Sequence, residues 1–129
     1  MGSATRQNTL QTDWIDITQS DILSIVSSPV VLLDSPWAGE TILVTQWVMD
    51  WDDGSTPYTY AGFLFIQMWG NTLFNLSNPL TGASIIKTAG WQAANLTENA
   101  QVVLTGSSVD PTSWDGTMKI KLFYTIETL

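Results

Sequence analysis

Polar and apolar residues alternate most regularly near the end of the chain, between residues 117 and 126. Successive side chains of a β-strand point to opposite faces, so a period of two predicts an antiparallel strand that is buried on one face. The apolar face of this strand carries Met118, Ile120, Leu122, Tyr124 and Ile126, and the polar face carries Thr117, Lys119, Lys121 and Thr125.

Shorter apolar runs bounded by turn residues predict further strands. The runs Thr41 to Trp51 and Phe63 to Trp69 hold apolar residues at both odd and even positions, which predicts burial on both faces of each strand. Strands are also expected over residues 30–33, 72–76 and 101–105, whereas residues 84–91 fit either a strand or a helical turn.

The beginning of the chain has a different pattern. Residues 1–13 are polar without a period, and Trp14, Ile15 and Ile17 follow them. We expect residues 1–17 to be an extended arm, with a first edge strand of the domain as the alternative for the apolar residues. Thr18 to Asp21 then resembles a helix start, since Ser or Thr can cap free N–H groups and an acid suits the positive helix end. A short helix is expected near 19–26, ending before Pro29.

Six to eight strands with turn signals between them, and no strand–helix–strand alternation, predict an all-β fold. The expected architecture is an antiparallel β-sandwich, jelly-roll-like, with one short N-terminal helix and an extended N-terminal arm. The expected division is an arm at 1–17 and a sandwich domain at 18–129.

Charged residues make up only 12% of the chain, against about 25% in an ordinary globular domain. The chain also holds seven Trp, each of which can bury roughly 150–250 Å². We therefore expect part of the exterior to be covered by other subunits and two or three Trp to lie at an interface; the alternative is a Trp-rich monomer core. The predicted partner-contact residues are Trp14, Ile15, Ile17, Trp47, Trp51 and Trp69.

Net charge and missing residue types exclude several function classes. With a formal charge of −8 and no basic run, neither nucleic acid nor an anionic membrane is an expected partner. No apolar stretch reaches the roughly 18 residues of a membrane-spanning helix. The sequence has no His and no Cys, which removes the commonest general base and the usual transition-metal ligands. We predict no catalytic residues, no metal site and no cofactor.

Two clusters could still carry chemistry. Asp50, Asp52 and Asp53 precede Gly54 and could hold Ca²⁺, or Asp50 and Asp52 could act as a glycosidase pair. The interpretation we favour is a turn, because the glycine comes too early for an EF-hand and Asp, Gly and Ser form turns for conformational reasons. An aromatic platform for sugars is the second possibility, with core and subunit packing favoured over it; its members would be Trp37, Trp47, Trp51, Tyr58 and Tyr60.

Several turn-and-strand segments between about residues 18 and 126 form a recognisable series: Ile22-Leu23, Ser28 to Leu33, Pro36 to Val44, Asp53-Gly54, Tyr58-Thr59, Asp115 to Ile120 and Phe123 to Ile126. This series resembles bacteriophage particle proteins of the β-sandwich type: capsid decoration (cement) proteins, head fibres and tail-fibre modules.

The resemblance implies a virion component that is not an enzyme. We expect a homotrimeric decoration protein on the outer capsid surface, whose partners are its own copies and the major capsid protein or other virion proteins. A tail- or head-fibre module that binds host-surface glycan is the alternative. A glycan hydrolase that uses acidic residues alone is a third, weaker possibility.

Overall fold

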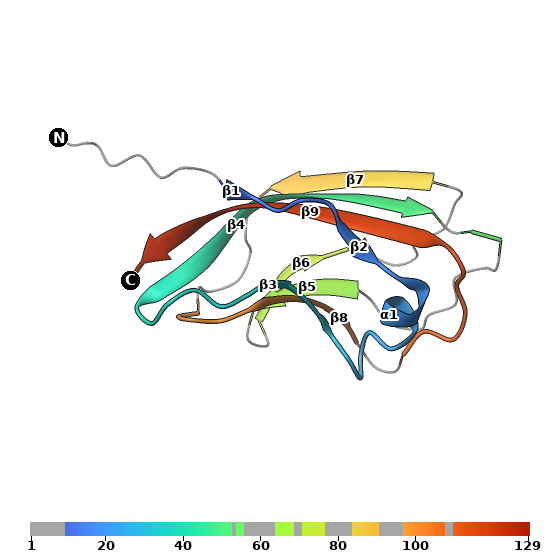
Figure 1. Ribbon diagram of the computed structural model, residues 1–129, viewed down its shortest axis with the longest axis horizontal. Coiled ribbons are helices and arrows are strands. Elements are labelled where there is room, and N and C mark those ends of the chain that lie inside the picture. The colour runs from blue at the N-terminus through green and yellow to red at the C-terminus, as the bar shows by residue number, and fades with distance from the viewer. Residues whose placement is uncertain are drawn as a thin grey trace.

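The computed structural model describes residues 10–52, 54–55, 64–68, 71–76, 84–90, 97–107 and 110–129, with the backbone alone at 71, 75 and 84–90. Within these residues two antiparallel sheets face each other and enclose the core (Figure 1). This confirms the expected all-β sandwich. Its elements are β1 (Leu10–Gln11), β2 (Ile15–Ile17), α1 (Gln19–Leu23), β3 (Val30–Leu33), β4 (Glu40–Asp52), β5 (Leu64–Met68), β6 (Asn71–Asn75), β7 (Ser84–Gly90), β8 (Val102–Gly106) and β9 (Thr117–Thr128).

The strand pairing follows one rule across the described elements. Strand β2 pairs with β9, β3 with β8, β4 with β7 and β5 with β6, all antiparallel. Each strand in the first half of the chain therefore pairs with a strand in the second half, in reverse order, so that the chain forms one long antiparallel ribbon. Pairing of β4 with β9 and of β5 with β8 rolls this ribbon into sheets of order β1-β9-β4-β7, with β2 also beside β9, and β3-β8-β5-β6. Such a rolled ribbon is a jelly roll.

A β-bulge in β4 changes the interpretation of its apolar pattern. The β4–β9 register shifts between Val44 and Gln46. Before the shift the buried residues Ile42 and Val44 lie opposite Ile126 and Tyr124; after it, Trp47, Met49 and Trp51 lie opposite Leu122, Ile120 and Met118. These five partners alternate along β9 and so share one face. The expected burial of both β4 faces is thus wrong for this group, because a bulge inserts one residue and brings even and odd positions onto the same side.

Strand pairing begins within the stretch expected to be an arm. Residues 10–11 (β1) and 15–17 (β2) both pair with β9, as the edge-strand alternative predicted for Ile15 and Ile17. The predicted cap is confirmed: the Thr18 hydroxyl accepts from the Asp21 N–H at 3.1 Å, and the Asp21 carboxylate accepts from the Thr18 N–H at 2.9 Å. This reciprocal pair is a capping box.

Helix α1 is shorter than the expected span of 19–26 because an acid from a distant loop captures its next N–H groups. Asp110 Oδ1 accepts from the N–H of Val26 at 2.7 Å and of Ser27 at 3.1 Å, and Asp110 Oδ2 accepts from the Ser27 hydroxyl at 2.8 Å. In a continued helix these N–H groups would bond to carbonyls four residues earlier. Asp110 thereby ties the segment after α1 to the loop after β8.

Asp110 makes the stability of this tie pH-dependent. Hydrogen bonds from the Ser27 hydroxyl and N–H, and then from the Val26 N–H, hold the pKa of Asp110 below its ordinary value of 3.8, although partial desolvation opposes them. A carboxyl whose folded pKa is depressed stabilises the fold above its unfolded pKa, and the contribution is lost as pH falls through the folded pKa. Asp110→Ala should therefore lower the free energy of unfolding near neutral pH, and the gap to the wild type should close below about pH 4.

Chemical denaturation of both proteins across this pH range would measure the gap. A gap that stays constant into strong acid would show that the Asp110 charge contributes nothing.

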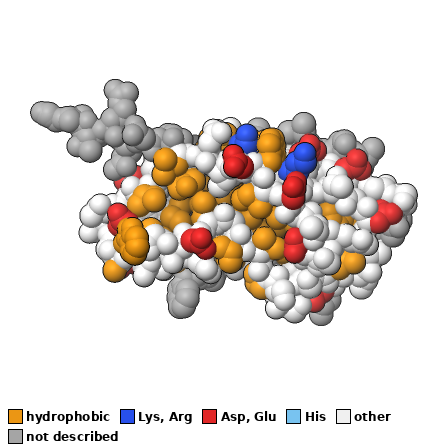
Figure 2. Space-filling model, viewed as in Figure 1, with side chains coloured by type: hydrophobic (Ala, Val, Ile, Leu, Met, Phe, Trp, Pro, Cys, Tyr) orange, Lys and Arg blue, Asp and Glu red, His pale blue; other side chains and the backbone are white. Residues whose placement is uncertain are grey.

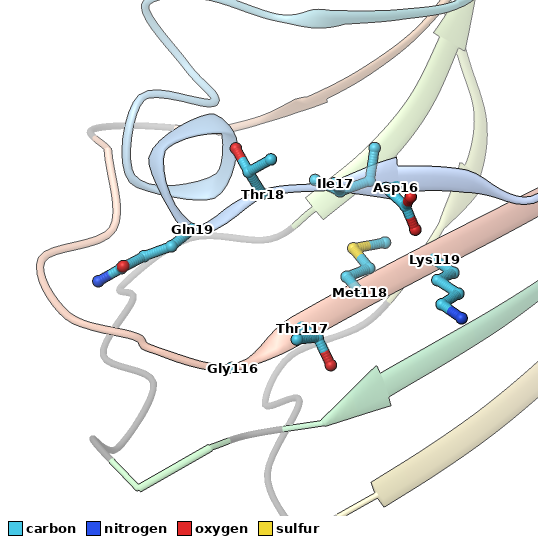
Figure 3. A pocket seen from close by; sticks show the side chains of 8 residues that line it. All are labelled: Asp16, Ile17, Thr18, Gln19, Gly116, Thr117, Met118 and Lys119. Carbon is cyan, nitrogen blue, oxygen red and sulfur yellow. The ribbon is translucent and has the colours of Figure 1, made fainter.

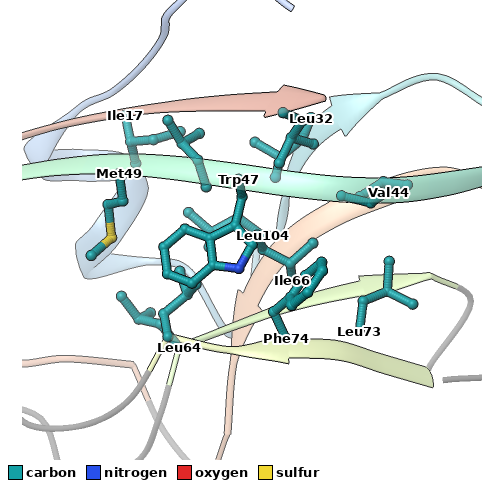
Figure 4. Close-up of a cluster of buried hydrophobic side chains, with 14 of the residues drawn as sticks. Ile17, Leu32, Val44, Trp47, Met49, Leu64, Ile66, Leu73, Phe74 and Leu104 are labelled. Atoms are coloured by element: carbon teal, nitrogen blue, oxygen red, sulfur yellow. The ribbon is translucent and has the colours of Figure 1, made fainter. Parts of the chain in front are cut away.

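The core between the sheets holds three of the tryptophans. Trp51 and Trp114 stack with ring centroids 4.6 Å apart and planes at 19°, and both are fully buried. Trp47 reaches from β4 toward the other sheet and lies 6.1 Å from the Phe74 ring at 60° (Figure 4). Offset-stacked and tilted pairs of this kind add stability beyond the buried area.

Candidate interaction surface

Asp50 and Asp52 of the acidic cluster lie at the end of β4, and Gly54 and Ser55 lie just beyond it. Asp52 Oδ1 accepts from the Gly54 N–H at 2.9 Å, and Asp115 accepts from the Ser55 N–H and hydroxyl at 2.8 and 2.7 Å. Gly54 has a φ of +73°, a conformation that favours glycine. Among the described residues no group of three or more acids could hold a metal ion; Asp53 lies outside them. These hydrogen bonds support a turn at Gly54 and Ser55, whereas Asp50 lies within β4 and outside that turn.

A hollow of about 300 Å³ lies between the end of β2 and the start of β9 (Figure 3). Two of its lining residues, Asp16 and Lys119, lie opposite each other in the β2–β9 pair, and Lys119 also lies opposite Asp50 in the β4–β9 pair. Opposite charges in neighbouring strands stabilise a sheet modestly. Asp50 and Asp52 do not line the hollow, so it does not supply a cleft for the glycosidase pair. Its lining is Asp16, Ile17, Thr18, Gln19, Gly116, Thr117, Met118 and Lys119.

The predicted partner-contact residues separate into two groups. Ile17, Trp47 and Trp51 are buried in the domain's own core and offer almost no surface to a partner. The prediction needs correction there, because the bulge in β4 turns Trp47 and Trp51 inward. Trp14 is 43% exposed, and Ile15 is half-buried against the core. Trp69 lies outside the described residues.

Trp14 is held on the surface by a basic residue. The Lys121 ammonium lies 4.9 Å from the centroid of the Trp14 ring, within the range of a cation–π interaction. The contact joins the β1–β2 connection to the outer face of β9. It leaves part of the indole accessible, so partner contact through Trp14 stays a proposal.

The expected aromatic platform for sugars does not form from its described members. Trp47 and Trp51 are buried, whereas Trp37 is 81% exposed in the turn before β4. Tyr58 and Tyr60 lie outside the described residues. Trp37 is therefore exposed to solvent, and neither Trp47 nor Trp51 joins it in a surface platform.

Four of the described large apolar residues are exposed on edge strands or beside the ends of strands, and we refer to these four together as the apolar side: Leu10, Val31, Trp37 and Leu129. Leu10 belongs to β1 and Val31 to β3, which are edge strands of the two sheets. The backbone of Leu129 lies beside the turn that contains Trp37. The Leu129 N–H donates to the Gly39 carbonyl at 2.8 Å, and the Trp37 carbonyl accepts from the Glu40 N–H at 3.0 Å. Figure 2 shows hydrophobic side chains exposed on the face of the molecule that is turned to the viewer.

The hydrophobic pattern along the chain did not indicate the apolar side. Trp37 follows Pro36 and precedes Ala38-Gly39, so the signal for its exposure was a large apolar residue inside a tight turn. Val31 is exposed and the next residue, Leu32, is buried, because successive side chains of a strand point to opposite faces. No helix in the described part of the chain has the length and hydropathy needed to cross a membrane.

The comparisons with known proteins bear on the fold. No family model matches the chain, and no curated protein matches it. The fold is similar to that of a phage capsid chain. One chain of the solved capsid asymmetric unit of cyanophage Pam1 matches with a TM-score of 0.55 and 17% sequence identity, covering 97% of this chain and 89% of that one. The match therefore spans the whole jelly roll, and the matched chain is only slightly longer than this one.

Proposed function

We propose that this chain is a structural subunit of a bacteriophage virion that decorates the capsid as a homotrimer. The observation that carries the proposal is the match to a chain of the cyanophage capsid over 97% of this sequence. Jelly rolls recur in viral capsid proteins, which agrees with this assignment. The sequence has no His and no Cys, which favours a role in binding over one in catalysis.

The apolar side is the surface we assign to partner contact. Large exposed apolar patches on a soluble domain mark interaction sites more often than isolated apolar residues do. Trp is also enriched among the residues that dominate binding energy, and Trp37 is the most exposed large apolar residue of the described set. Its partners would be other copies of the chain and the major capsid protein or another virion protein.

The proposed mechanism is mechanical. A subunit that binds only the assembled shell stabilises that shell by mass action, because every bound copy must leave before the shell can open. The outer surface of the capsid is the location that suits this role. Symmetric packing of three copies would bury apolar surface that the low content of charged residues leaves exposed.

Binding to empty shells of the phage that encodes this chain tests the proposal. The wild-type chain should sediment with the shells, and Trp37→Asp should weaken binding about tenfold or more, since a buried Trp contact is commonly worth above 1.4 kcal/mol. Thr117→Ala, which changes an exposed residue at the far end of β9, is the matched control. Absence of wild-type binding would contradict the proposal, as would equal binding by all three proteins.

The oligomeric state is tested separately by sedimentation equilibrium. The chain has a mass of 14.2 kDa, so a homotrimer should sediment with three times that mass. Trp37→Asp should shift the population toward monomer if the apolar side joins the copies. A wild-type chain that stays monomeric at every concentration would contradict the trimer.

The exposure of Trp37 also favours a second candidate function, a fibre module that binds host-surface glycan. An exposed indole can stack on the apolar face of a sugar ring. Glycan-array binding that is lost in Trp37→Ala would support this candidate over decoration. Trp51→Ala is not a suitable test, because Trp51 is fully buried and its loss would alter the fold itself.

A further inference from the structure

The turn before β4 fixes the backbone of Trp37 while its side chain stays in solvent. The Trp37 carbonyl accepts from the Glu40 N–H at 3.0 Å, and the Trp37 N–H donates to Oε1 of Glu40 at 3.2 Å. Both backbone polar groups of Trp37 are therefore hydrogen-bonded, whereas its side chain is 81% exposed. The turn holds the main chain and presents the indole.

Gly39 is the third residue of this turn and is bonded to two distant segments. Its φ of +83° is a left-handed conformation, which favours glycine at this place in a β-turn. The Gly39 N–H donates to Oε2 of Glu98 at 2.6 Å, and the Gly39 carbonyl accepts from the Leu129 N–H at 2.8 Å. The segment before β8 and the end of β9 thus hold the same residue, and Figure 1 shows the turn beside the C-terminal end of β9.

The segment that carries Glu98 is itself anchored to the start of β4. The Thr41 hydroxyl donates to the Thr97 carbonyl at 2.7 Å, and the Asn99 N–H donates to the Glu40 carbonyl at 2.7 Å. Asn99 has a φ of 51°, a left-handed conformation in which asparagine is enriched among residues other than glycine. Because hydrogen bonds hold the residues on both sides of Glu98, its carboxylate extends to the turn from a fixed backbone.

The bond between Glu98 and Gly39 is the shortest of those that hold the turn. A hydrogen bond from a backbone N–H to a carboxylate is shorter and roughly twice as strong as one between neutral groups. The two residues are 59 positions apart in the chain, so the bond fixes the turn against a separate segment of the domain. The bond from Trp37 to the Glu40 carboxylate is longer and stays within the turn itself.

We propose that Glu98 is a positioning residue for partner contact, because its carboxylate holds the turn in the conformation that presents the Trp37 indole. A site whose binding conformation is populated for only part of the time loses affinity by that fraction. Fixing the conformation beforehand also lowers the entropy lost on binding. The partner is the virion protein of the proposed function, so this inference rests on that proposal for the partner, whereas the bond between Glu98 and the turn belongs to the chain alone.

Hydrogen exchange of the Gly39 amide tests the bond in the isolated chain. Glu98→Ala removes the acceptor, so exchange should speed up about fivefold or more, and Glu98→Gln, which keeps an acceptor oxygen, should show a smaller change. Glu127→Ala is the matched control: it removes the same charge opposite Thr41, but the Glu127 carboxylate accepts from the Thr125 hydroxyl at 2.6 Å and not from the turn. A Gly39 rate that is unchanged in Glu98→Ala would overturn the proposal.

A double-mutant cycle with shell binding tests the positioning role. Glu98→Ala should weaken binding about fivefold or more when Trp37 is present and less than about twofold in a Trp37→Ala chain, because a residue that acts by placing the indole has no effect once the indole is gone. Glu98→Gln should retain most of the binding. Equal losses in the two backgrounds would overturn the positioning role, since a general structural defect acts on both. A wild-type chain that does not bind shells would contradict the proposed function, and the Gly39 exchange rates then decide the role of Glu98 by themselves.

Discussion

Trp51→Ala should lower the free energy of unfolding by about 3–5 kcal/mol, the usual cost of removing a buried Trp. Trp51 is fully buried, lies opposite Met118 in the β4–β9 pair and stacks on Trp114 at 4.6 Å. Truncation would leave a cavity between the two sheets and remove the stacking partner of Trp114. A whole domain is commonly stable by only about 5–15 kcal/mol, so this loss is a large share of the total.

Urea denaturation measures this effect, with Trp37→Ala as the control. Trp37 is exposed, and a substitution there should change the free energy of unfolding by no more than about 0.5 kcal/mol. A Trp51→Ala variant that unfolds at the same urea concentration as Trp37→Ala would contradict the assignment of Trp51 to the core.

Gly116→Ala should destabilise the fold although it adds only one methyl group. A Cβ at this position would overlap the carbonyl oxygen of Asp52 and lie 2.6 Å from Nε1 of Trp114. On the facing loop, a Cβ at Gly54 would overlap Oδ1 of Asp115 and lie 2.8 Å from the Gly116 nitrogen. The backbone at Asp52 and Gly54, at the end of β4, therefore packs against the backbone at Asp115 and Gly116, just before β9, and an added methyl group has to separate them.

The expected cost of Gly116→Ala is at least about 1–3 kcal/mol, the usual range for overpacking. Gly39→Ala is the control, because nothing lies within 4 Å of a Cβ there and only its φ of +83° opposes the substitution. Thermal unfolding should show a larger loss for Gly116→Ala than for Gly39→Ala. The reverse order would show that the two loops are not in close contact.

The sequence predicted the fold best where local patterns decide the structure. The alternation of β9 identified the face that carries Met118, Ile120 and Leu122, and these three are buried. Thr18 and Asp21 marked the helix start because both partners of the cap are neighbours in sequence. The order of strands in the two sheets needed long-range pairing, which no local pattern encodes.

The bulge in β4 explains the main error. A single inserted residue between Val44 and Gln46 reverses the inward parity, and nothing in the run of residues 41–51 distinguishes this from a strand buried on both faces. Trp47 and Trp51 were consequently assigned to a partner and belong to the core. The end of α1 was missed for a related reason, since Asp110 is more than eighty residues away from Val26.

The case for assembly consequently depends on a different surface from the one expected. Trp47 and Trp51 of β4, which were expected to be buried by neighbouring subunits, are buried in the core of the domain itself. Exposed apolar residues on the edge strands and on the turn before β4 remain, with Trp37 foremost among them. These are the residues through which a shell or a second copy would be bound.

The proposed function assigns this chain to a phage, and electron cryomicroscopy of that phage's particle tests it most directly. We expect density for this jelly roll in threefold groups on the outer capsid surface, with Trp37 covered by a neighbouring subunit. Particles that lack the chain altogether would contradict a virion role.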